Sequence, residues 1–281
     1  MTEYYESDWL ALRKDADAVA RDRALAIRAR DWLADRPAPI RIADLGAGSG
    51  ANPRFLATYL PGPQHWRLFD HDPELLAQAA ARLAEARDED GTPIRFETCR
   101  QDLADLDAAI ADDIDLATAS ALLDLASAEW IDALAARCAR VGCAALWSMT
   151  VDGKWHFTRS DGNRIQDADD AVMLSELQAH QVRDKGLGRA LGGAAPKTIR
   201  AAFARHGYNI AEAPSPWRLL AGTQQPLALT LLDGWRTALI EQAPEDEPRI
   251  EAWWRRRRAG VAAGDLGIEV GHVDLYAEPP P

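Results

Sequence analysis

Hydrophobic positions in the first 150 residues follow two patterns: short apolar runs, and longer segments with apolar residues three and four positions apart. The short runs predict buried strands, and the longer segments predict amphipathic helices. The predicted strands are 40–45, 66–70, 94–99, one within 114–122, and 143–151. The predicted helices are 7–36, 52–60, 73–87 and 129–141, with Ser7 and Asp72 as expected N-caps. This alternation indicates an α/β fold with a parallel sheet covered by helices on both faces.

The alternation becomes irregular after residue 152. Further helices are predicted at 168–182, 197–207, 223–242 and 247–261, and further strands at 208–214 and 268–278. The glycine-rich segment 183–196 has the composition of a mobile loop. We therefore expect one domain over residues 1–281. Its expected parts are an N-terminal helical cap (1–38), a core (40–151), a lid-like insertion (152–207), and the last strands with C-terminal helices (208–281).

The segment ADLGAGSGA (43–51) joins the first predicted strand to a helix. Gly46, Gly48 and Gly50 allow the backbone to turn sharply and to approach a ligand closely. The following helix offers unpaired N–H groups at its N-terminus. Asp70 ends the second strand, where a carboxylate can accept two hydrogen bonds from a ribose diol. This combination predicts an adenosine-containing ligand at the carboxyl ends of the strands.

Two cofactor classes are compatible with this turn. Gly46, Gly48 and Ala51 satisfy the dinucleotide fingerprint, so a nicotinamide-dependent oxidoreductase is one alternative. Asp44 favours S-adenosylmethionine, because a carboxylate there would repel a pyrophosphate but can anchor an ammonium group directly or through water. Asp102 follows the third strand and can accept a hydrogen bond from an adenine amino group. We therefore expect S-adenosylmethionine as the cofactor.

The segments ADLGAGSG, LFDHDPELL, CRQDLADL and IDLATASALLDL, in this order and spacing, resemble the signature segments of class I S-adenosylmethionine-dependent methyltransferases. The resemblance covers about residues 40–150. It implies a Rossmann-like, seven-stranded, mostly parallel sheet, in which an antiparallel seventh strand lies between the fifth and sixth. It also implies that the glycines line the methionine part, that Asp102 and Leu103 bracket the adenine, and that Ser120 lies beside the sulfonium. The expected cofactor residues are Asp44, Gly46, Ala47, Gly48, Gly50, Asp70, His71, Asp102, Leu103 and Ser120.

The methyl acceptor is predicted less directly. No NPPY-type tetrapeptide follows the fourth strand, which weighs against methylation of amides or exocyclic amines. We expect a small polar acceptor, anionic or aromatic, with His180 and Asp184 as candidate catalytic residues. A histidine on the helix surface or in the core is the alternative for His180. The candidate acceptor-binding residues are Asp124, Trp147, Arg183, Lys185, Trp217 and Arg218. A protein of this fold that binds the cofactor without catalysis is a further alternative.

Charge and composition limit the possible partners. The net charge of −12 argues against a nucleic-acid or anionic-membrane binder. The run WWRRRR (253–258) is expected to be a helix face paired with carboxylates. Regularly placed Arg and Asp residues in 7–25 predict ion pairs within a helix, although such a helix often closes over the cofactor in the resembled family. The three cysteines form no zinc or redox motif, and no metal site is expected.

The expected location is cytoplasmic, since the first ten residues lack the apolar region of a signal peptide and no apolar stretch approaches membrane-spanning length. The sequence leaves the oligomeric state open.

Overall fold

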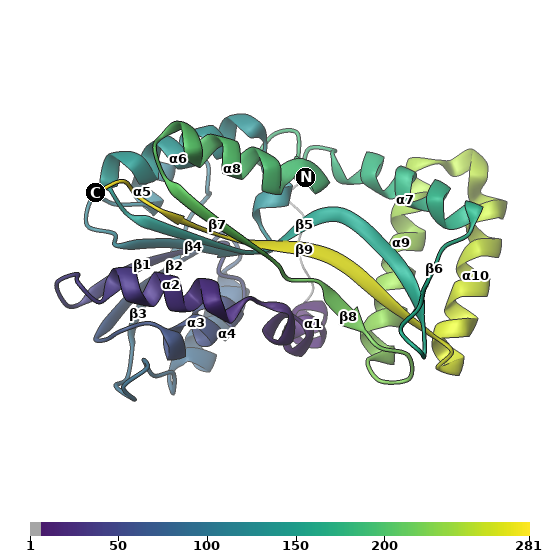
Figure 1. Ribbon diagram of the computed structural model, residues 1–281, viewed down its shortest axis with the longest axis horizontal. Helices are drawn as coiled ribbons and strands as arrows, with labels where there is room; N and C mark the ends of the chain where they lie inside the picture. The colour runs from purple at the N-terminus through teal and green to yellow at the C-terminus, as the bar shows by residue number, and fades with distance from the viewer. Residues whose placement is uncertain (1–6) are drawn as a thin grey trace.

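A computed structural model describes residues 7–281 and contains one mixed sheet (Figure 1). The main path through this sheet has the strand order β3-β2-β1-β4-β5-β9-β7. Its strands are β1 (Ile40–Leu45), β2 (Gln64–Asp70), β3 (Arg95–Arg100), β4 (Leu116–Ser120), β5 (Ala144–Arg159), β7 (Asn209–Pro214) and β9 (Leu266–Glu278). The first five pair in parallel, whereas β9 is antiparallel to both β5 and β7. The strand order implied by the resemblance is therefore confirmed.

Helices cover both faces of the parallel part of the sheet (Figure 1). One face packs against α2 (Arg23–Leu33), α3 (Ala51–Leu56) and α4 (Pro73–Leu83), and the other packs against α5 (Leu106–Ala109), α6 (Ala128–Val141) and α8 (Ala195–Arg205). Short 3₁₀ turns lie at Ala57–Tyr59, Leu123–Leu125, Gly192–Ala194 and Pro244–Asp246. Because the central strands are buried on both sides, they are continuous apolar runs in the sequence, which is why they were predictable.

The N-terminal segment, predicted as one helix over 7–36, forms two helices instead. These are α1 (Ser7–Ala20) and α2, and the chain bends between them at Arg21 and Asp22. The Asp22 side chain caps α2 by accepting the N–H of Leu25 at 2.9 Å. An aspartate that bonds to the backbone two or three residues ahead favours a helix start over a helix interior, which explains the break. The predicted cap by Ser7 lies outside the side chains that the structure describes.

Strand β5 runs well beyond the predicted end at residue 151. Together with β9 it leaves the parallel part of the sheet and curves into a second lobe (Figure 1). Asp152, Gly153 and Lys154 suggest a turn in the sequence, but here they form a β-bulge with Gly153 at a φ of +75°. The expected lid-like insertion over 152–207 is therefore incorrect in its first part, since residues 152–159 continue the sheet.

The second lobe packs three helices against this extension. They are α7 (Ala168–Gln181), α9 (Gln225–Gln242) and α10 (Glu247–Ala263), and the short strands β6 (Arg164–Ile165) and β8 (Trp217–Leu219) pair with β5 and β9. Within the lobe the carboxylate of Asp170, 1% exposed, accepts hydrogen bonds from Arg257 Nε at 2.9 Å and from Trp253 Nε1 at 2.8 Å. The arginine run pairs with carboxylates, as expected for a helix face: Arg255 with Glu251, Arg256 with Asp167 and Asp169, and Arg258 with Asp233.

Among residues 7–281, no helix has the length and apolar content needed to span a membrane.

Candidate functional site

A cavity of about 240 Å³ opens at the carboxyl ends of β1, β2 and β4. The turn between β1 and α3 lines it, and Gly46, Gly48 and Gly50 in this turn have φ angles of +63°, +52° and +80°. These left-handed conformations favour glycine, which has no Cβ. At Gly50 a Cβ would also lie 3.1 Å from the Cβ of Ala79 on α4. Glycine therefore lets the turn pack close to α4 while its backbone faces the cavity. Ala47, from the same turn, lines the cavity as well.

The end of β2 places a carboxylate in the wall of this cavity. Asp70 is 6% exposed, and its Oδ2 accepts the N–H of Gly48 at 2.8 Å while its Oδ1 accepts the N–H of Asp72 at 3.0 Å. These two bonds fix the carboxylate before any ligand arrives. His71 also lines the cavity, with Nδ1 3.4 Å from Asp70 Oδ1. Asp72 accepts two N–H groups from the first turn of α4, so its predicted role as an N-cap is confirmed.

The loop after β3 forms another part of the wall, with Asp102 and Leu103 both lining the cavity. Asp102 Oδ1 accepts the N–H of Ala104 at 2.9 Å, which holds the loop in a tight turn. The carbonyl of Leu103 accepts Nε1 of Trp130, on α6, at 2.8 Å. The loop is therefore tied both to itself and to the adjacent helix.

A buried polar network lies beneath the glycine turn. Asp44, at the end of β1, is fully buried, and its Oδ1 accepts Nδ2 of Asn52 at 2.5 Å. Among the described residues, no group hydrogen-bonds to Oδ2, although this oxygen is buried. Burial raises the pKa of Asp44 to about 7, even though the Asn52 hydrogen bond and the charge of Arg21 act to lower it. A cation placed near this carboxyl group would favour its ionised form.

A buried arginine completes the network from the N-terminal side. Arg21, 5% exposed, donates from Nη1 to Asn52 Oδ1 at 3.0 Å and from Nη2 to Ser120 Oγ at 2.8 Å. Its guanidinium carbon lies 4.9 Å from the centroid of the Phe55 ring. Arg21, Asn52 and Ser120 all line the cavity. Asn52 therefore bridges a carboxyl group and a guanidinium group at one end of the cavity.

The helical segment before β1 contributes more to the site than its sequence indicated. Arg13, Asp17 and Arg21 are spaced four residues apart, which predicted ion pairs within a helix, and Arg13 Nε does lie 2.9 Å from Asp17 Oδ2. All three residues nevertheless line the cavity. The contact from Arg21 to Ser120 spans 99 positions, so no local pattern could reveal it.

Most of the segments that line the first cavity match a known protein family. Residues 42–142, which span the glycine turn, Asp70, the β3 loop and β4, match the family described as "Methyltransferase domain". Residues 42–142 therefore form a class I, S-adenosylmethionine-dependent methyltransferase domain. A comparison with curated protein sequences found no match.

The solved structures that this chain resembles are distant from it in sequence. The cyclopropane synthase MmaA2 from Mycobacterium tuberculosis is 13% identical, with a TM-score of 0.49, over 97% of this chain and 94% of that one. An S-adenosylmethionine-dependent methyltransferase from Geobacter sulfurreducens, in complex with S-adenosyl-L-homocysteine, is 16% identical, with a TM-score of 0.46, over all of both chains. A phosphoethanolamine N-methyltransferase 2 from Haemonchus contortus is 14% identical, with a TM-score of 0.45, over 99% of this chain and 59% of that one.

A second cavity, of about 180 Å³, adjoins the first, and Arg13 and Ala121 line both. Two of the predicted acceptor-binding residues, Asp124 and Trp217, line this second cavity. Ala121 directly follows β4 and has a φ of +53°, and Met149, in the same wall, has a φ of +58°. Such conformations are strained for residues other than glycine and are concentrated at functional sites.

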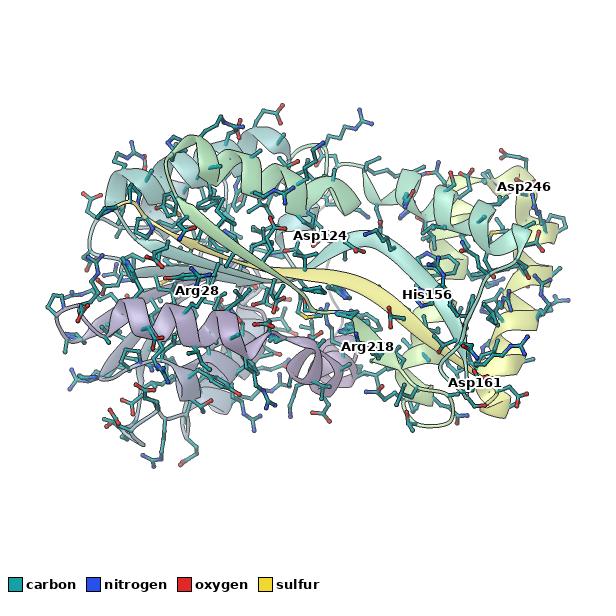
Figure 2. All side chains as sticks on the ribbon, in the orientation of Figure 1. Arg28, Asp124, His156, Asp161, Arg218 and Asp246 are labelled. Atoms are coloured by element: carbon teal, nitrogen blue, oxygen red, sulfur yellow. The ribbon has the colours of Figure 1, made fainter. Side chains whose placement is uncertain are left out.

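The other predicted acceptor-binding and catalytic residues lie outside the second cavity. Lys185 lines the first cavity. Trp147 is fully buried in the core against Phe203 of α8 and lines neither cavity. His180 lies 3.2 Å from Glu241 on α9, and Arg183 bonds to Gln242 at 2.6 Å. Arg218 pairs with Glu269 at 3.3 Å, and Asp184 accepts the N–H of Gly186 at 2.8 Å. Figure 2 shows Arg218, on β8, below Asp124 in this view.

The glycine-rich loop was the basis for the four predictions at 180–185. Loop composition indicates mobility, but it does not indicate the direction in which the side chains point. Here α7 ends against α9, and so His180 and Arg183 contact that helix. Neither residue lines either cavity, and we assign neither a role in methyl transfer.

Proposed function

We propose that the chain transfers a methyl group from S-adenosylmethionine to a small polar molecule by in-line displacement. In this proposal the first cavity holds the cofactor: Asp70 binds the ribose diol, Asp102 and Leu103 bracket the adenine, and the glycine turn contacts the methionine part. The bound cofactor supplies a methyl group on a positively charged sulfur. The two cavities share Ala121, next to Ser120, and this contact supports transfer at that point.

The pairing of opposite charges around Asn52 carries the proposal. Arg21 lines this end of the cavity and suits the carboxylate of an amino acid, whereas Asp44 lies buried behind Asn52 and would favour the ammonium group through Asn52 or a water molecule. A dinucleotide would instead bring a pyrophosphate to the glycine turn, close to Asp44 and Asp70. The buried carboxyl group therefore favours a zwitterionic ligand over a nicotinamide nucleotide.

The protein's contribution to rate is mainly positioning. Methyl transfer requires the nucleophile, the methyl carbon and the sulfur in line, and holding them in this geometry supplies a large part of the barrier reduction. Arg13 lies between the two cavities and is fixed by Asp17 through Nε and Nη2, at 2.9 and 3.2 Å. In this proposal α1 orients both ligands and excludes water from the point of transfer.

A cytoplasmic location also stays a prediction.

Calorimetric titration with S-adenosylhomocysteine tests the proposal, with NAD and NADP as parallel controls. We expect micromolar binding of the homocysteine compound alone. Binding of only a nicotinamide nucleotide would overturn the proposal and favour an oxidoreductase. An R21M variant should bind S-adenosylhomocysteine about tenfold more weakly, since a charge-assisted hydrogen bond contributes about 1.5–3 kcal/mol. R54M is the matched control, because Arg54 lies on the adjacent helix α3 but does not line the cavity.

A further inference from the structure

The second cavity has an unusual aromatic lining, and we refer to it below as the tryptophan chamber. It lies where the parallel sheet meets the second lobe, and each of its four indoles comes from a different element. They are Trp9 (α1), Trp155 (β5), Trp217 (β8) and Trp235 (α9). An engineered protein cavity of about 150 Å³ binds benzene. The volume of about 180 Å³ is therefore the size of a single aromatic ring with small substituents.

The indoles are held in fixed orientations rather than packed loosely. The Trp155 and Trp235 rings lie 4.6 Å apart at an interplanar angle of 32°, and Trp9 meets Trp217 edge-on at 6.1 Å. Trp217 Nε1 donates to Asp17 at 2.9 Å, which fixes its ring plane. Aromatic pairs of this kind stabilise a third ring through offset or edge-to-face contacts. The chamber is thus built in advance for a flat ligand.

The charges around the chamber favour a neutral ring over a cation. Arg13 already lies over the Trp217 ring, 5.0 Å from its centroid, and Lys154 also lines the chamber. Asp124 is the one carboxylate among the lining residues that the structure describes. Both cations are paired, Arg13 with Asp17 and Lys154 with Asp152, but Arg13 already covers the Trp217 face that an ammonium ligand would need. An amine in its charged form would also lack the lone pair needed to accept a methyl group.

A buried histidine supplies a hydrogen-bond acceptor to the same chamber. His272, on β9, is 5% exposed, and its ring lies 5.1 Å from that of Trp217. Its Nδ1 lies 3.1 Å from the carbonyl of Val270. A carbonyl can only accept, so Nδ1 carries the proton and Nε2 carries a lone pair. Among the described residues, no group forms a hydrogen bond to Nε2.

The surroundings keep this imidazole neutral. Burial, reinforced by the charge of Arg13, lowers the pKa of His272 to about 4, while Asp17 on α1 and Asp152 on β5 act in the opposite direction. At neutral pH the ring is therefore an acceptor at Nε2 and a donor at Nδ1. Protonation would place a second cation beside Arg13.

Resting on the proposed function, we infer that the acceptor is a single aromatic ring bearing a hydroxyl group, held among the four tryptophans with its O–H donated to His272 Nε2. The hydroxyl oxygen uses a lone pair to form the new bond to the methyl carbon, and the electron pair of the breaking carbon–sulfur bond stays on sulfur. The hydroxyl proton passes to Nε2 and then to water. A weak base suffices, because an oxygen that has gained a methyl group is far more acidic than an imidazolium ion.

Binding experiments on the full chain, first saturated with S-adenosylhomocysteine, test this inference. The probes are phenol, cyclohexanol and tetramethylammonium, which share a similar size but offer an aromatic hydroxyl, an aliphatic hydroxyl and a cation. We expect phenol to bind at least tenfold more tightly than either of the others. W235L should weaken phenol binding at least fivefold and leave the affinity for S-adenosylhomocysteine unchanged. W254L is the control, since Trp254 belongs to the same lobe but does not line the chamber.

The histidine contact is tested by comparing phenol with toluene, which has the same shape and no O–H. The wild type should prefer phenol at least tenfold, H272F should lose this preference, and H272Q, which keeps an acceptor, should retain most of it. A merely structural histidine would change both affinities together and leave their ratio intact, which would overturn its role.

Other outcomes are equally decisive. Tighter binding of tetramethylammonium would indicate a cation cage, and equal binding of cyclohexanol a simple apolar pocket; either result overturns the inference. If S-adenosylhomocysteine binds but phenol does not, the chamber assignment fails and the proposed function stands. If S-adenosylhomocysteine does not bind, the proposed function fails and this inference fails with it.

Discussion

Asp44 should release a proton when the cofactor product binds. In the ligand-free protein, burial raises the pKa of this carboxyl group to about 7, so at pH 6 about nine-tenths of the molecules carry the proton. An ammonium group nearby favours the ionised carboxylate and lowers its pKa. Binding of S-adenosylhomocysteine should therefore release about 0.9 proton at pH 6, about 0.5 at pH 7 and about 0.1 at pH 8.

The same linkage fixes the pH dependence of affinity. Because the carboxyl group must lose its proton, the apparent dissociation constant should rise about tenfold for each pH unit below about 7 and be flat above it. In the ligand-free protein, the free energy of unfolding changes with pH in the opposite direction to the affinity. A pKa raised in the folded state makes the free energy of unfolding fall as the pH rises from 3.8 to about 7. Over that window the shift corresponds to about 4 kcal/mol.

The assay is calorimetry in pairs of buffers with low and high enthalpies of ionisation, between pH 5.5 and 8. The D44N variant is the control, since it keeps the shape and an acceptor oxygen but cannot titrate. We expect proton release to disappear in D44N and its affinity to become independent of pH over this range. Equal proton release by D44N and the wild type would refute the reasoning, because another group would then be responsible.

Three further predictions follow from the contacts described above. D70A should bind S-adenosylhomocysteine about 10–100-fold more weakly by calorimetry, since two charge-assisted hydrogen bonds to the ribose are lost; an unchanged affinity would contradict the ribose assignment. D170A should lower the free energy of unfolding in urea by about 3–5 kcal/mol, because the buried Arg257 would keep only the more exposed Asp167 as a carboxylate partner. D169A removes the more exposed ion pairs of Asp169 with Arg249 and Arg256, and should lower the free energy of unfolding by less than about 1 kcal/mol. Equal losses of stability in D170A and D169A would refute the role of burial.

The lining of the first cavity was predictable where its residues are close together in sequence or stand at strand ends. The turn that contains Gly46, Gly48 and Gly50 follows directly from β1, and Asp70 is the last residue of β2. Parallel strands bring their carboxyl ends to one edge of the sheet, so residues at strand ends must meet there. Asp44 shows the limit of this reasoning: its position was predictable, but its unpartnered Oδ2 and its bond to Asn52 depend on packing.

The tryptophan chamber was predicted poorly because the residues that line it are distant in sequence. The chamber joins indoles at positions 9, 155, 217 and 235, and only Trp217 was a predicted acceptor-binding residue, because the other three look like ordinary core residues within their own segments. The segment Asp152–Lys154 suggested that β5 had ended, which removed Trp155 from the predicted sheet. The sequence around His272 is that of an ordinary strand, so it favours a position facing solvent or the core over a role at the site. Its ring is neutral because it is buried against Trp217. Among the described residues, no group forms a hydrogen bond to its Nε2.

One buried carboxylate connects segments that line the first cavity and the tryptophan chamber. Asp274, 1% exposed, accepts the N–H of Asp22 at 2.9 Å, the N–H of Met149 at 2.7 Å and the hydroxyl of Ser215 at 2.6 Å. These groups belong to the bend before α2, to a second irregularity in β5 between Trp147 and Thr150, and to the segment leading into β8. Burial raises the pKa of Asp274, while its three hydrogen bonds act to lower it. The bend that points Arg21 into the first cavity and the irregularity at Met149, in the wall of the second, therefore depend on the same side chain. Because a buried carboxylate is costly unless its donors are in place, the two cavities should form together when the N-terminal helices dock.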